Sequence, residues 1–318
     1  MRILIAGGAG LIGSHLCERL LNEDHTVICV DNLLTGSKKN LKSFNSHKNF
    51  SLVMHDVIKP LPATLEADAI FHLASPASPN HHSKISYHAL PMETMLANTT
   101  GTLELLKFAQ KNKAKFLFAS SSEAYGDPEK HPQKEDYRGN VSTTGPRSVY
   151  DESKRFGETL ISYFVRSQGL DARIARIFNT YGPRLAKEDM RMIGIFIVEA
   201  LQNKPITIFG DGTQTRSLCY IDDMVDGLIR LMLYPNTQGE IVNLGSTNEH
   251  TVNEYAKLIK KLTNSKSKIT YSEKLPQDDP KRRRPDISKA KKLLDWQPHI
   301  SLKDGLTKMI QYFQKNEL

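Results

Sequence analysis

Residues 1–13 read MRILIAGGAGLIG, in which a short apolar run at 2–5 passes into closely spaced glycines and then into a helical pattern over 11–21. A strand, a glycine-rich turn and a helix in this order can hold a pyrophosphate, because glycines let the backbone approach the phosphates at the helix N-terminus. Asp31 ends the next predicted strand, where a carboxylate can bind ribose hydroxyls and repel a 2′-phosphate. A plain tight turn would not require this acid, so we predict a dinucleotide site that prefers NAD to NADP.

The first half of the chain alternates predicted strands with predicted helices. The strands are 2–5, 26–31, 50–55, 69–73, 115–120 and 172–178, and the helices are 11–21, 92–111 and 148–168. This alternation is typical of right-handed βαβ units and a parallel sheet covered on both faces. We therefore predict an α/β fold with a Rossmann-type doubly wound sheet and a smaller, discontinuous C-terminal α/β domain.

The second half is less regular. It contains predicted helices at 193–201, 221–233, 252–263 and 302–314, a strand at 240–244, a polar loop at 210–216 and a charged loop at 277–285. The helix 221–233 and the strand 240–244 look like a return to the first sheet. We therefore expect an NAD-binding domain of residues 1–178 and 219–247 and a substrate domain of residues 179–218 and 248–318.

Length and composition agree with a globular chain of about two domains. The 318 residues are 39% hydrophobic and 25% charged, which excludes a disordered or fibrous chain. No apolar stretch reaches the roughly 18 residues of a membrane span, and the N-terminus lacks the shape of a signal peptide, so we expect a cytoplasmic protein that binds no membrane. The three cysteines lie far apart, which leaves no disulfide framework and no CxxC metal site.

The formal charge of +8 favours an anionic partner. The basic run 281–284 lacks the recognition helix or stacking aromatic residues of a nucleic-acid site, so we expect no nucleic-acid partner. The pair His81-His82 has no third ligand at a suitable spacing, and we expect no metal site.

Tyr150 and Lys154 stand four residues apart near the start of a predicted helix and share one face of it. An ammonium group beside a phenol is expected to lower the pKa of the phenol and to make Tyr150 usable as an acid or a base. The strand 115–120 runs into Ser121, Ser122 and Glu123, at the sheet edge where open α/β folds bind ligands. These residues can cap a turn, or they can orient a substrate and move a proton.

The glycine turn, Asp31, the serine-rich strand end and Tyr150-x-x-x-Lys154 together resemble the extended short-chain dehydrogenase/reductase family. Within it, the stretches 72–79, 120–128, 145–155, 176–184, 210–223 and 278–287 resemble the UDP-glucuronate decarboxylases. The resemblance covers nearly the whole chain. It implies decarboxylation of UDP-glucuronate to UDP-xylose and CO2 through a 4-keto sugar, with NAD bound and regenerated.

The resemblance also implies roles for individual residues. Tyr150 and Lys154 would be the catalytic pair, with Ser121 orienting the sugar, Glu123 handling a proton and Arg283 facing the sugar. Besides the catalytic pair, the residues expected to bind the cofactor are Gly7, Gly10, Leu11, Ile12, Gly13, Asp31, Asn32, Thr35, Gly36, Asp56, Val57, Leu73, Ala74, Ser75, Asn98, Thr180 and Arg191. Besides Arg283, those expected to bind the UDP-sugar are Ser122, Asn179, Gly194, Ile195, Ile208, Phe209, Gln214 and Arg216.

Some positions depart from the family pattern. Ser122 stands where the related 4,6-dehydratases have an aspartate, and a departing CO2 needs no such acid, which favours a decarboxylase. Ser121 stands where threonine is expected, which preserves the hydroxyl. Leu96, Ile195 and Arg138 stand where lysine, asparagine and tryptophan are expected, which leaves the C2 substituent of the sugar open. The alternatives are a decarboxylase of UDP-N-acetylglucosaminuronate, a producer of UDP-4-keto-pentose, a UDP-hexuronate 4-epimerase, and an NAD-sensing interaction protein. Relatives pair through the helices 92–111 and 148–168, so we expect a homodimer.

Overall fold

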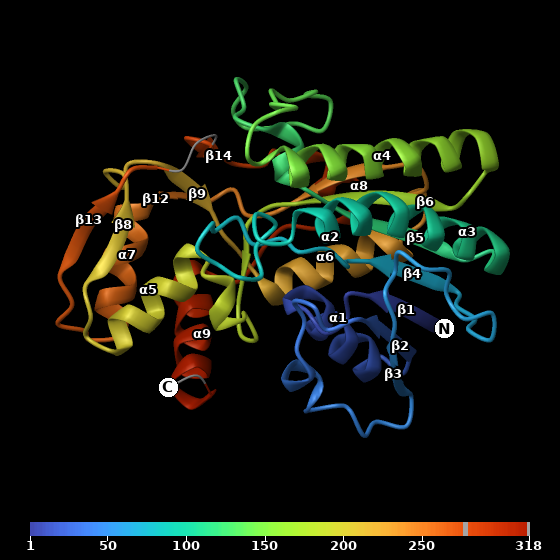
Figure 1. Cartoon of the computed structure of the whole chain (residues 1–318), viewed down its shortest axis with the longest axis horizontal. Coiled ribbons are helices and arrows are strands. Elements are labelled where there is room, and N and C mark those ends of the chain that lie inside the picture. The colour runs from blue at the N-terminus through green and yellow to red at the C-terminus, as the bar shows by residue number, and fades with distance from the viewer. Residues whose placement is uncertain (276–278, 317–318) are drawn as a thin grey trace.

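The main sheet is a seven-stranded parallel sheet in a computed structural model that describes residues 1–275 and 279–316 (Figure 1). Its strand order is β11-β6-β5-β4-β1-β2-β3, with all neighbours parallel. The strands are β1 (Arg2–Ala6), β2 (Thr26–Asp31), β3 (Phe50–Met54), β4 (Ala69–His72), β5 (Lys115–Ser121), β6 (Ala172–Ile177) and β11 (Ile241–Leu244). The predicted doubly wound sheet is confirmed, and the late strand β11 returns to its edge.

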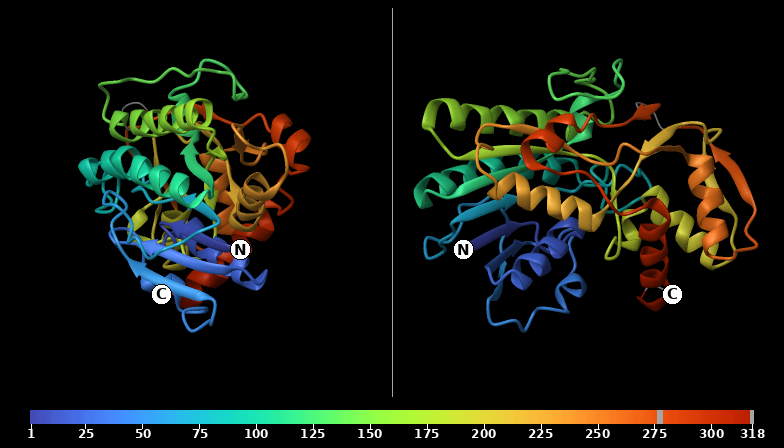
Figure 2. Two further views of the ribbon diagram at one scale, coloured as in Figure 1. Left: turned by 90° about the vertical axis from the view of Figure 1, so that its right-hand side faces the viewer. Right: turned by 180° about the vertical axis from the view of Figure 1, so that it is seen from behind.

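Helices cover both faces of this sheet (Figures 1 and 2). One face carries α2 (Pro91–Leu96), α3 (Thr102–Asn112) and α4 (Ser148–Gln168), and the other carries α1 (Leu11–Asn22) and α6 (Ile221–Leu233). Strand alternation explains the two cores: Ile3 and Ile5 pack on the side of α1, and Leu4 and Ala6 pack on the side of α3. Both faces of β1 are therefore apolar, as its sequence indicates.

The predicted helix 92–111 is wrong as a single α-helix. A π-helical turn, Ala97–Gly101, separates α2 from α3. Asn98 lies in this turn and donates its Nδ2 to the Ser153 hydroxyl on α4, at 3.0 Å. Gly101 packs so closely against Val57 that a Cβ there would lie 2.9 Å from the valine Cγ2. The contacts with Ser153 and Val57 hold this wider turn in place. Such contacts produce no periodic pattern in the sequence.

The rest of the chain builds three small sheets, which lie to the left in Figure 1 and toward the centre. They pair β8 (Ile206–Phe209) with β13 (Ile269–Glu273), β7 (Thr180–Tyr181) with β10 (Cys219–Tyr220), and β9 (Thr215–Ser217) with β12 (Glu249–Thr251) and β14 (Arg282–Arg283). The accompanying helices are α5 (Met192–Leu201), α7 (Val252–Leu262), α8 (Ser288–Leu294) and α9 (Leu302–Asn316). Among the described residues, no helix combines the length and apolarity needed to cross a bilayer.

Two predicted loops contain strand residues. The loop 210–216 runs into β9, and the loop 277–285 contains β14. Gln277 and Asp278 lie outside the described residues. Strands of two or three residues have no periodicity of their own, so long-range pairing alone creates them. Neither β8, β13 nor α8 was predicted from the sequence.

Candidate active site

Two glycines of the turn between β1 and α1, Gly7 and Gly13, have no room for a side chain. Gly7 has φ +82°, and a Cβ on Gly13 would lie 2.1 Å from the Gly7 carbonyl oxygen. The backbone at these glycines therefore carries no side chain where a pyrophosphate meets the N-terminus of α1. This cradle fits the phosphates of a dinucleotide.

A smaller cavity of about 310 Å³ continues from this turn between β2 and α2. Its wall includes Asp31, whose carboxylate accepts hydrogen bonds from the backbone N–H groups of Ala9 at 2.9 Å and Leu33 at 2.8 Å. Burial raises the pKa of Asp31, and these two hydrogen bonds oppose that shift. A carboxylate fixed in this way, beside Asn32 and Asp56, suits the hydroxyls of an adenosine ribose.

The larger cavity, of about 570 Å³, extends from the glycine turn across the end of β5 to α5 and β8. Ser121 ends β5 and accepts a hydrogen bond from the backbone N–H of Glu123 at 3.2 Å. This bond caps the short 3₁₀ helix Ser122–Tyr125 and holds the three residues 121–123 on the cavity wall. The capping role that the sequence allowed is therefore observed, and the same residues also lie on the cavity wall.

Tyr150 and Lys154 both line this cavity from the first turns of α4. The Lys154 ammonium donates to the Ala119 carbonyl oxygen at 2.8 Å and lies 5.6 Å from the centre of the Tyr150 ring. Burial lowers the pKa of Lys154 to about 7, with Glu158 opposing the shift. The expected lowering of the Tyr150 pKa is wrong for this structure: burial raises it to about 12, although a hydrogen bond with Ser121 opposes the rise.

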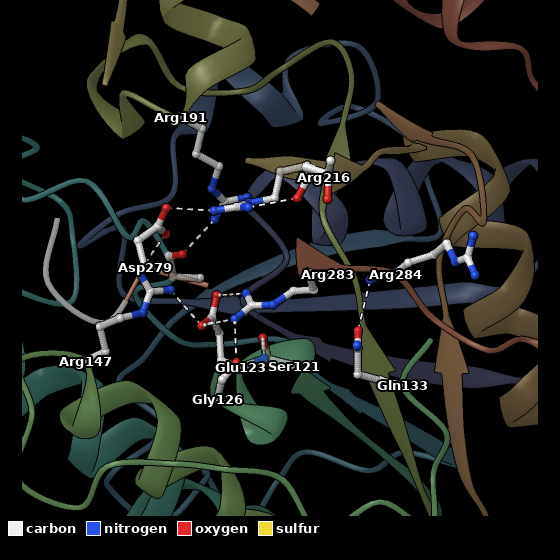
Figure 3. Close-up of polar contacts among 12 residues, drawn as sticks. Ser121, Glu123, Gly126, Gln133, Arg147, Arg191, Arg216, Asp279, Arg283 and Arg284 are labelled. Carbon is white, nitrogen blue, oxygen red and sulfur yellow. Dashed lines mark hydrogen bonds and ion pairs between the residues drawn. The ribbon is translucent and has the colours of Figure 1, made fainter. Parts of the chain in front are cut away.

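Glu123 lies between two arginines (Figure 3). Arg283 contacts both carboxylate oxygens, at 2.5 and 3.0 Å, and Arg147 contacts one at 2.7 Å. Burial alone would raise the pKa of Glu123, but the charges of Arg147 and Arg283 hold it well below its ordinary value. Glu123 is therefore ionised at neutral pH.

Asp279 links two of the arginines on the other side of this cluster (Figure 3). Its carboxylate accepts from Arg216 at 2.7 Å and from Arg147 at 3.5 Å. Burial lowers the pKa of Arg216, while the charge of Asp279 opposes this. Both Arg147 and Arg216 line the larger cavity, so cationic groups converge where an anionic substrate is expected.

Most of the residues predicted from the sequence lie on the two cavity walls. The smaller cavity has Gly7, Gly10, Asp31, Asn32, Thr35, Gly36, Asp56, Val57, Leu73, Ala74 and Ser75. The larger has Gly7, Gly10, Leu11, Ile12, Gly13, Thr35, Leu73, Ser75, Ser121, Ser122, Glu123, Tyr150, Lys154, Asn179, Thr180, Arg191, Ile195, Phe209, Gln214 and Arg216. The structure therefore brings together segments from almost the whole chain.

Four predicted residues lie behind these walls. Asn98 is fully buried against Ser153. Ile208, a residue of β8, points into the hydrophobic core, and Gly194 packs near Leu185. Arg283 is only 3% exposed and reaches the cavity through Glu123. Of the departures from the family pattern, Leu96 lines the smaller cavity and Ile195 the larger, whereas the Arg138 carbonyl accepts from Arg155.

Several residues in or beside the site could not be predicted from the sequence. Arg147 stands three positions before Tyr150, and this spacing places it near the same helical face. The spacing is the sequence feature from which its place in the site could have been predicted. Tyr87 stacks on Tyr150 at 4.9 Å and has no sequence signal that marks it. Asp151 is buried beside them, and burial together with the charge of Glu123 raises its pKa to about 8. The described residues contain no group of three or more His, Cys, Asp or Glu that could hold a metal ion.

The fold and the two adjoining cavities define a dinucleotide-dependent enzyme of the short-chain dehydrogenase/reductase type. The family model described as the NAD dependent epimerase/dehydratase family matches residues 3–245, and the chain belongs to this family.

Among curated proteins, the chain is 49% identical to UDP-glucuronic acid decarboxylase 1 of Danio rerio, over 99% of this chain and 73% of that protein. It is 50% identical to UDP-glucuronic acid decarboxylase 3 of Arabidopsis thaliana, over 99% of this chain and 89% of that protein. Among solved structures, UDP-glucose 4-epimerase of Thermotoga maritima with UDP-glucose is 30% identical, with a TM-score of 0.90 and full coverage of both chains. UDP-glucuronic acid 4-epimerase of Bacillus cereus with UDP-glucuronic acid and NAD is 29% identical, with a TM-score of 0.85 and 99% coverage of both.

Proposed function

We propose that this protein decarboxylates UDP-glucuronate to UDP-xylose and CO2 through a 4-keto sugar. The observation that carries the proposal is 45–50% identity, over nearly the whole chain, to UDP-glucuronic acid decarboxylases of animals and plants. The site agrees with this chemistry, because a buried Tyr150–Lys154 pair and a cluster of arginines share one cavity.

Residues 1–178 and 219–247 bind NAD, and residues 179–218 and 248–318 bind the UDP-sugar. The bare turn Gly7–Gly13 holds the pyrophosphate, and Asp31 binds the adenosine ribose and disfavours a 2′-phosphate. Bound NAD supplies the acceptor for the C4 hydride and the hydride that later returns to C4.

Tyr150 takes the proton of the sugar O4, with Ser121 holding the phenol and the sugar in place. The Lys154 ammonium lies on the same cavity wall and favours the phenolate by its positive charge. Burial raises the pKa of Tyr150 and lowers that of Lys154 to about 7, so we expect Lys154 to assist the phenol as a base in the molecules in which it is protonated.

Loss of CO2 from C6 is easy once C4 is a ketone, because the electron pair of the C5–C6 bond passes into an enolate. Ser122 lines the wall here, so this position has a hydroxyl and not a carboxylic acid that could assist a competing loss of water. Glu123 is ionised and can accept a proton at the start of the cycle. It must therefore become protonated before it can donate a proton to C5. Arg147 and Arg283 compensate the charge of Glu123 and leave one net positive charge to meet the uronate.

The protein acts as a homodimer in the cytoplasm. Met92 on α2 and Phe156 and Tyr163 on α4 are 56%, 50% and 49% exposed, although all three are large and apolar or aromatic. A second copy that packs helix against helix would cover them. The three cysteines are free and buried, as suits a reducing compartment.

The test is incubation of the purified protein with UDP-glucuronate, UDP-galacturonate and UDP-N-acetylglucosaminuronate, with CO2 and the nucleotide sugar quantified by mass spectrometry and proton NMR. We expect one CO2 for each UDP-xylose from UDP-glucuronate. Conversion of UDP-glucuronate to UDP-galacturonate with no CO2 would make the enzyme a 4-epimerase, and accumulation of UDP-4-keto-pentose would limit it to the first half of the reaction.

A further inference from the structure

Three arginines and two carboxylates gather beside the larger cavity (Figure 3). The arginines are Arg147, Arg216 and Arg283, and the carboxylates are those of Glu123 and Asp279. All of these residues except Arg283 line the cavity wall. A UDP-hexuronate brings further anionic groups to this wall, its diphosphate and its carboxylate, and there it meets carboxylates that already contact the arginines.

The two carboxylates are held very differently. Glu123 is 8% exposed, follows the capped end of β5, and accepts hydrogen bonds from Arg147 and, through both of its oxygens, from Arg283. The side chain of Asp279 is 21% exposed. Within residues 1–275 and 279–316, its carboxylate accepts hydrogen bonds only from Arg216, at 2.7 Å, and Arg147, at 3.5 Å. Asp279 is therefore the carboxylate that can leave the arginines with less disturbance of the fold.

The two arginines on the cavity wall need an anion beside them. The Nε of Arg147 is buried and has no hydrogen-bond partner among the described residues. Arg216 donates its Nη1 to the Thr215 carbonyl oxygen at 2.8 Å and its Nη2 to Asp279. Burial lowers the pKa of Arg216, and the charge of Asp279 opposes this shift. A largely buried guanidinium requires a compensating anion, whether the protein or a ligand supplies it.

We propose that Asp279 is an internal counter-anion that competes with the substrate for Arg216 and Arg147, so that an anionic group of the UDP-sugar takes its place on these arginines. The nature of the ligand rests on the proposed function, whereas the exchange of one anion for another does not require decarboxylation. The diphosphate and the uronate share the relevant chemistry, since both present oxygen anions to a guanidinium fork. Because Asp279 and the ligand use the same donors, removing its charge should tighten binding.

The first test compares the Kd values of UDP, UDP-xylose and UDP-glucuronate by calorimetry on the NAD-containing protein. All variants carry Tyr150→Phe, which removes the phenol oxygen and allows binding of UDP-glucuronate to be measured without turnover. Asp279→Asn removes the competing charge, so Kd should fall about tenfold, as expected for one charge close to a partly buried arginine. Asp279→Ala, whose side chain accepts no hydrogen bond, should tighten binding at least as much.

The three ligands identify the group that displaces Asp279. Tighter binding of all three assigns the displacement to the diphosphate, and tighter binding of UDP-glucuronate alone assigns it to the uronate. Unchanged Kd values for all three ligands would overturn the proposal. Weaker binding in Asp279→Ala would also overturn it, because Asp279 would then arrange the arginines for the ligand instead of competing with it.

The matched control is Glu249→Gln, which removes one negative charge as well. Glu249 lies 3.9 Å from Arg282 and from Arg284, and it is not among the described residues on either cavity wall. The Kd values should therefore stay at those of the parent protein. An equal gain in Asp279→Asn and Glu249→Gln would assign the effect to the net charge of the protein and overturn the proposal.

The second test is thermal unfolding of the same proteins. Without nucleotide, Asp279→Asn leaves Arg216 and Arg147 with one anion fewer, so its Tm should lie below that of the parent protein. Saturating UDP-glucuronate should raise the Tm of the variant more than that of the parent, because the ligand supplies the missing anion. An equal rise in both proteins would contradict the exchange of anions.

The role of Asp279 and the proposed function can fail separately. If Asp279→Asn tightens binding of UDP-glucuronate but the wild type releases no CO2, the decarboxylase function is refuted and the role of Asp279 stands. If the wild type releases CO2 but neither Asp279 variant changes any Kd, only the role of Asp279 is refuted.

Discussion

Arg283 and Glu123 form a two-point ion pair, with nitrogen–oxygen distances of 2.5 and 3.0 Å, although 160 residues separate them in the chain. Arg283 comes from the two-residue strand β14, and Glu123 follows the end of the central strand β5. The pair therefore connects the main sheet with the small sheet β12-β9-β14, with Glu123 on the wall of the larger cavity and Arg283 behind it. Its geometry requires a planar fork of donors, which lysine cannot supply.

Arg283→Lys should lower kcat at saturating UDP-glucuronate by roughly 10-fold or more, because a single ammonium cannot hold both oxygens of Glu123 in place. Arg282→Lys is the matched control, since the side chain of Arg282 is 62% exposed and its charge is retained. It should be nearly silent at any salt concentration. Equal, small effects of the two changes in steady-state CO2 release would mean that the run 281–284 supplies only long-range attraction.

Glu123→Gln should lower turnover roughly 10²-fold, as expected for a group that handles a proton. It should also lower stability, because Arg147 and Arg283 lose their buried partner. The folded-state pKa of Glu123 is depressed, so its contribution to stability is full above about pH 4.5 and is lost as the pH falls below that. The Tm gap between wild type and variant should hold from pH 8 to 6 and narrow below 4.5. Near-normal turnover of Glu123→Gln would show that Glu123 does not handle a proton in the reaction.

Lys154→Met should abolish most activity, by roughly 10²–10⁴-fold, and should stabilise the fold. Burial lowers the pKa of Lys154 to about 7, so between pH 7 and 10.5 the unfolded chain binds a proton that the folded chain does not. Wild-type stability then rises with pH in this window, and the advantage of the variant should be largest at or below pH 7 and shrink toward pH 10. Thermal unfolding of the wild type and of Lys154→Met at pH 6.5 and 9.5 measures this difference in stability. Lys107→Met, at a position where the side chain is 56% exposed, is the control; the same pH trend in both variants would contradict the assignment.

Asp31→Ala should reduce the NAD(H) released on denaturation of the purified protein, while the Kd for UDP stays within about twofold. The reason is that Asp31 lines only the smaller of the two cavities. Asp68→Asn is a suitable control, because Asp68 accepts from the Arg2 backbone N–H at 2.7 Å, away from both cavity walls. Recovery of mainly NADP(H) from the wild type would refute the cofactor preference.

Phe156→Ser combined with Tyr163→Ser should convert the dimer to a monomer in sedimentation velocity, because it removes apolar contact area from the exposed face of α4. Tyr271→Ser changes an equally exposed side chain, at 57%, on β13 and should leave the mass unchanged. A wild-type protein that sediments as a monomer at micromolar concentration would refute the homodimer.

The parts of the fold that depend on local pattern could be predicted from the sequence. The run from β1 through the glycine turn to α1, and the strand β2 ending at Asp31, follow from apolar periodicity and from the freedom of glycine. The four-residue spacing of Tyr150 and Lys154 places both on one face of α4, and the structure puts both on the cavity wall. For these features the neighbouring residues carry all of the relevant information.

Only the tertiary structure decided the features that join distant segments. The split of the basic run depends on pairing of β14 with β9, and the stacking of Tyr87 on Tyr150 has no counterpart in periodicity. The π-helical turn at Ala97–Gly101 depends on its contacts with Ser153 and Val57. The pKa values also depend on the tertiary structure. The sequence shows which groups are neighbours along a helix, but the pKa of Tyr150 is set mainly by how deeply the fold buries its side chain.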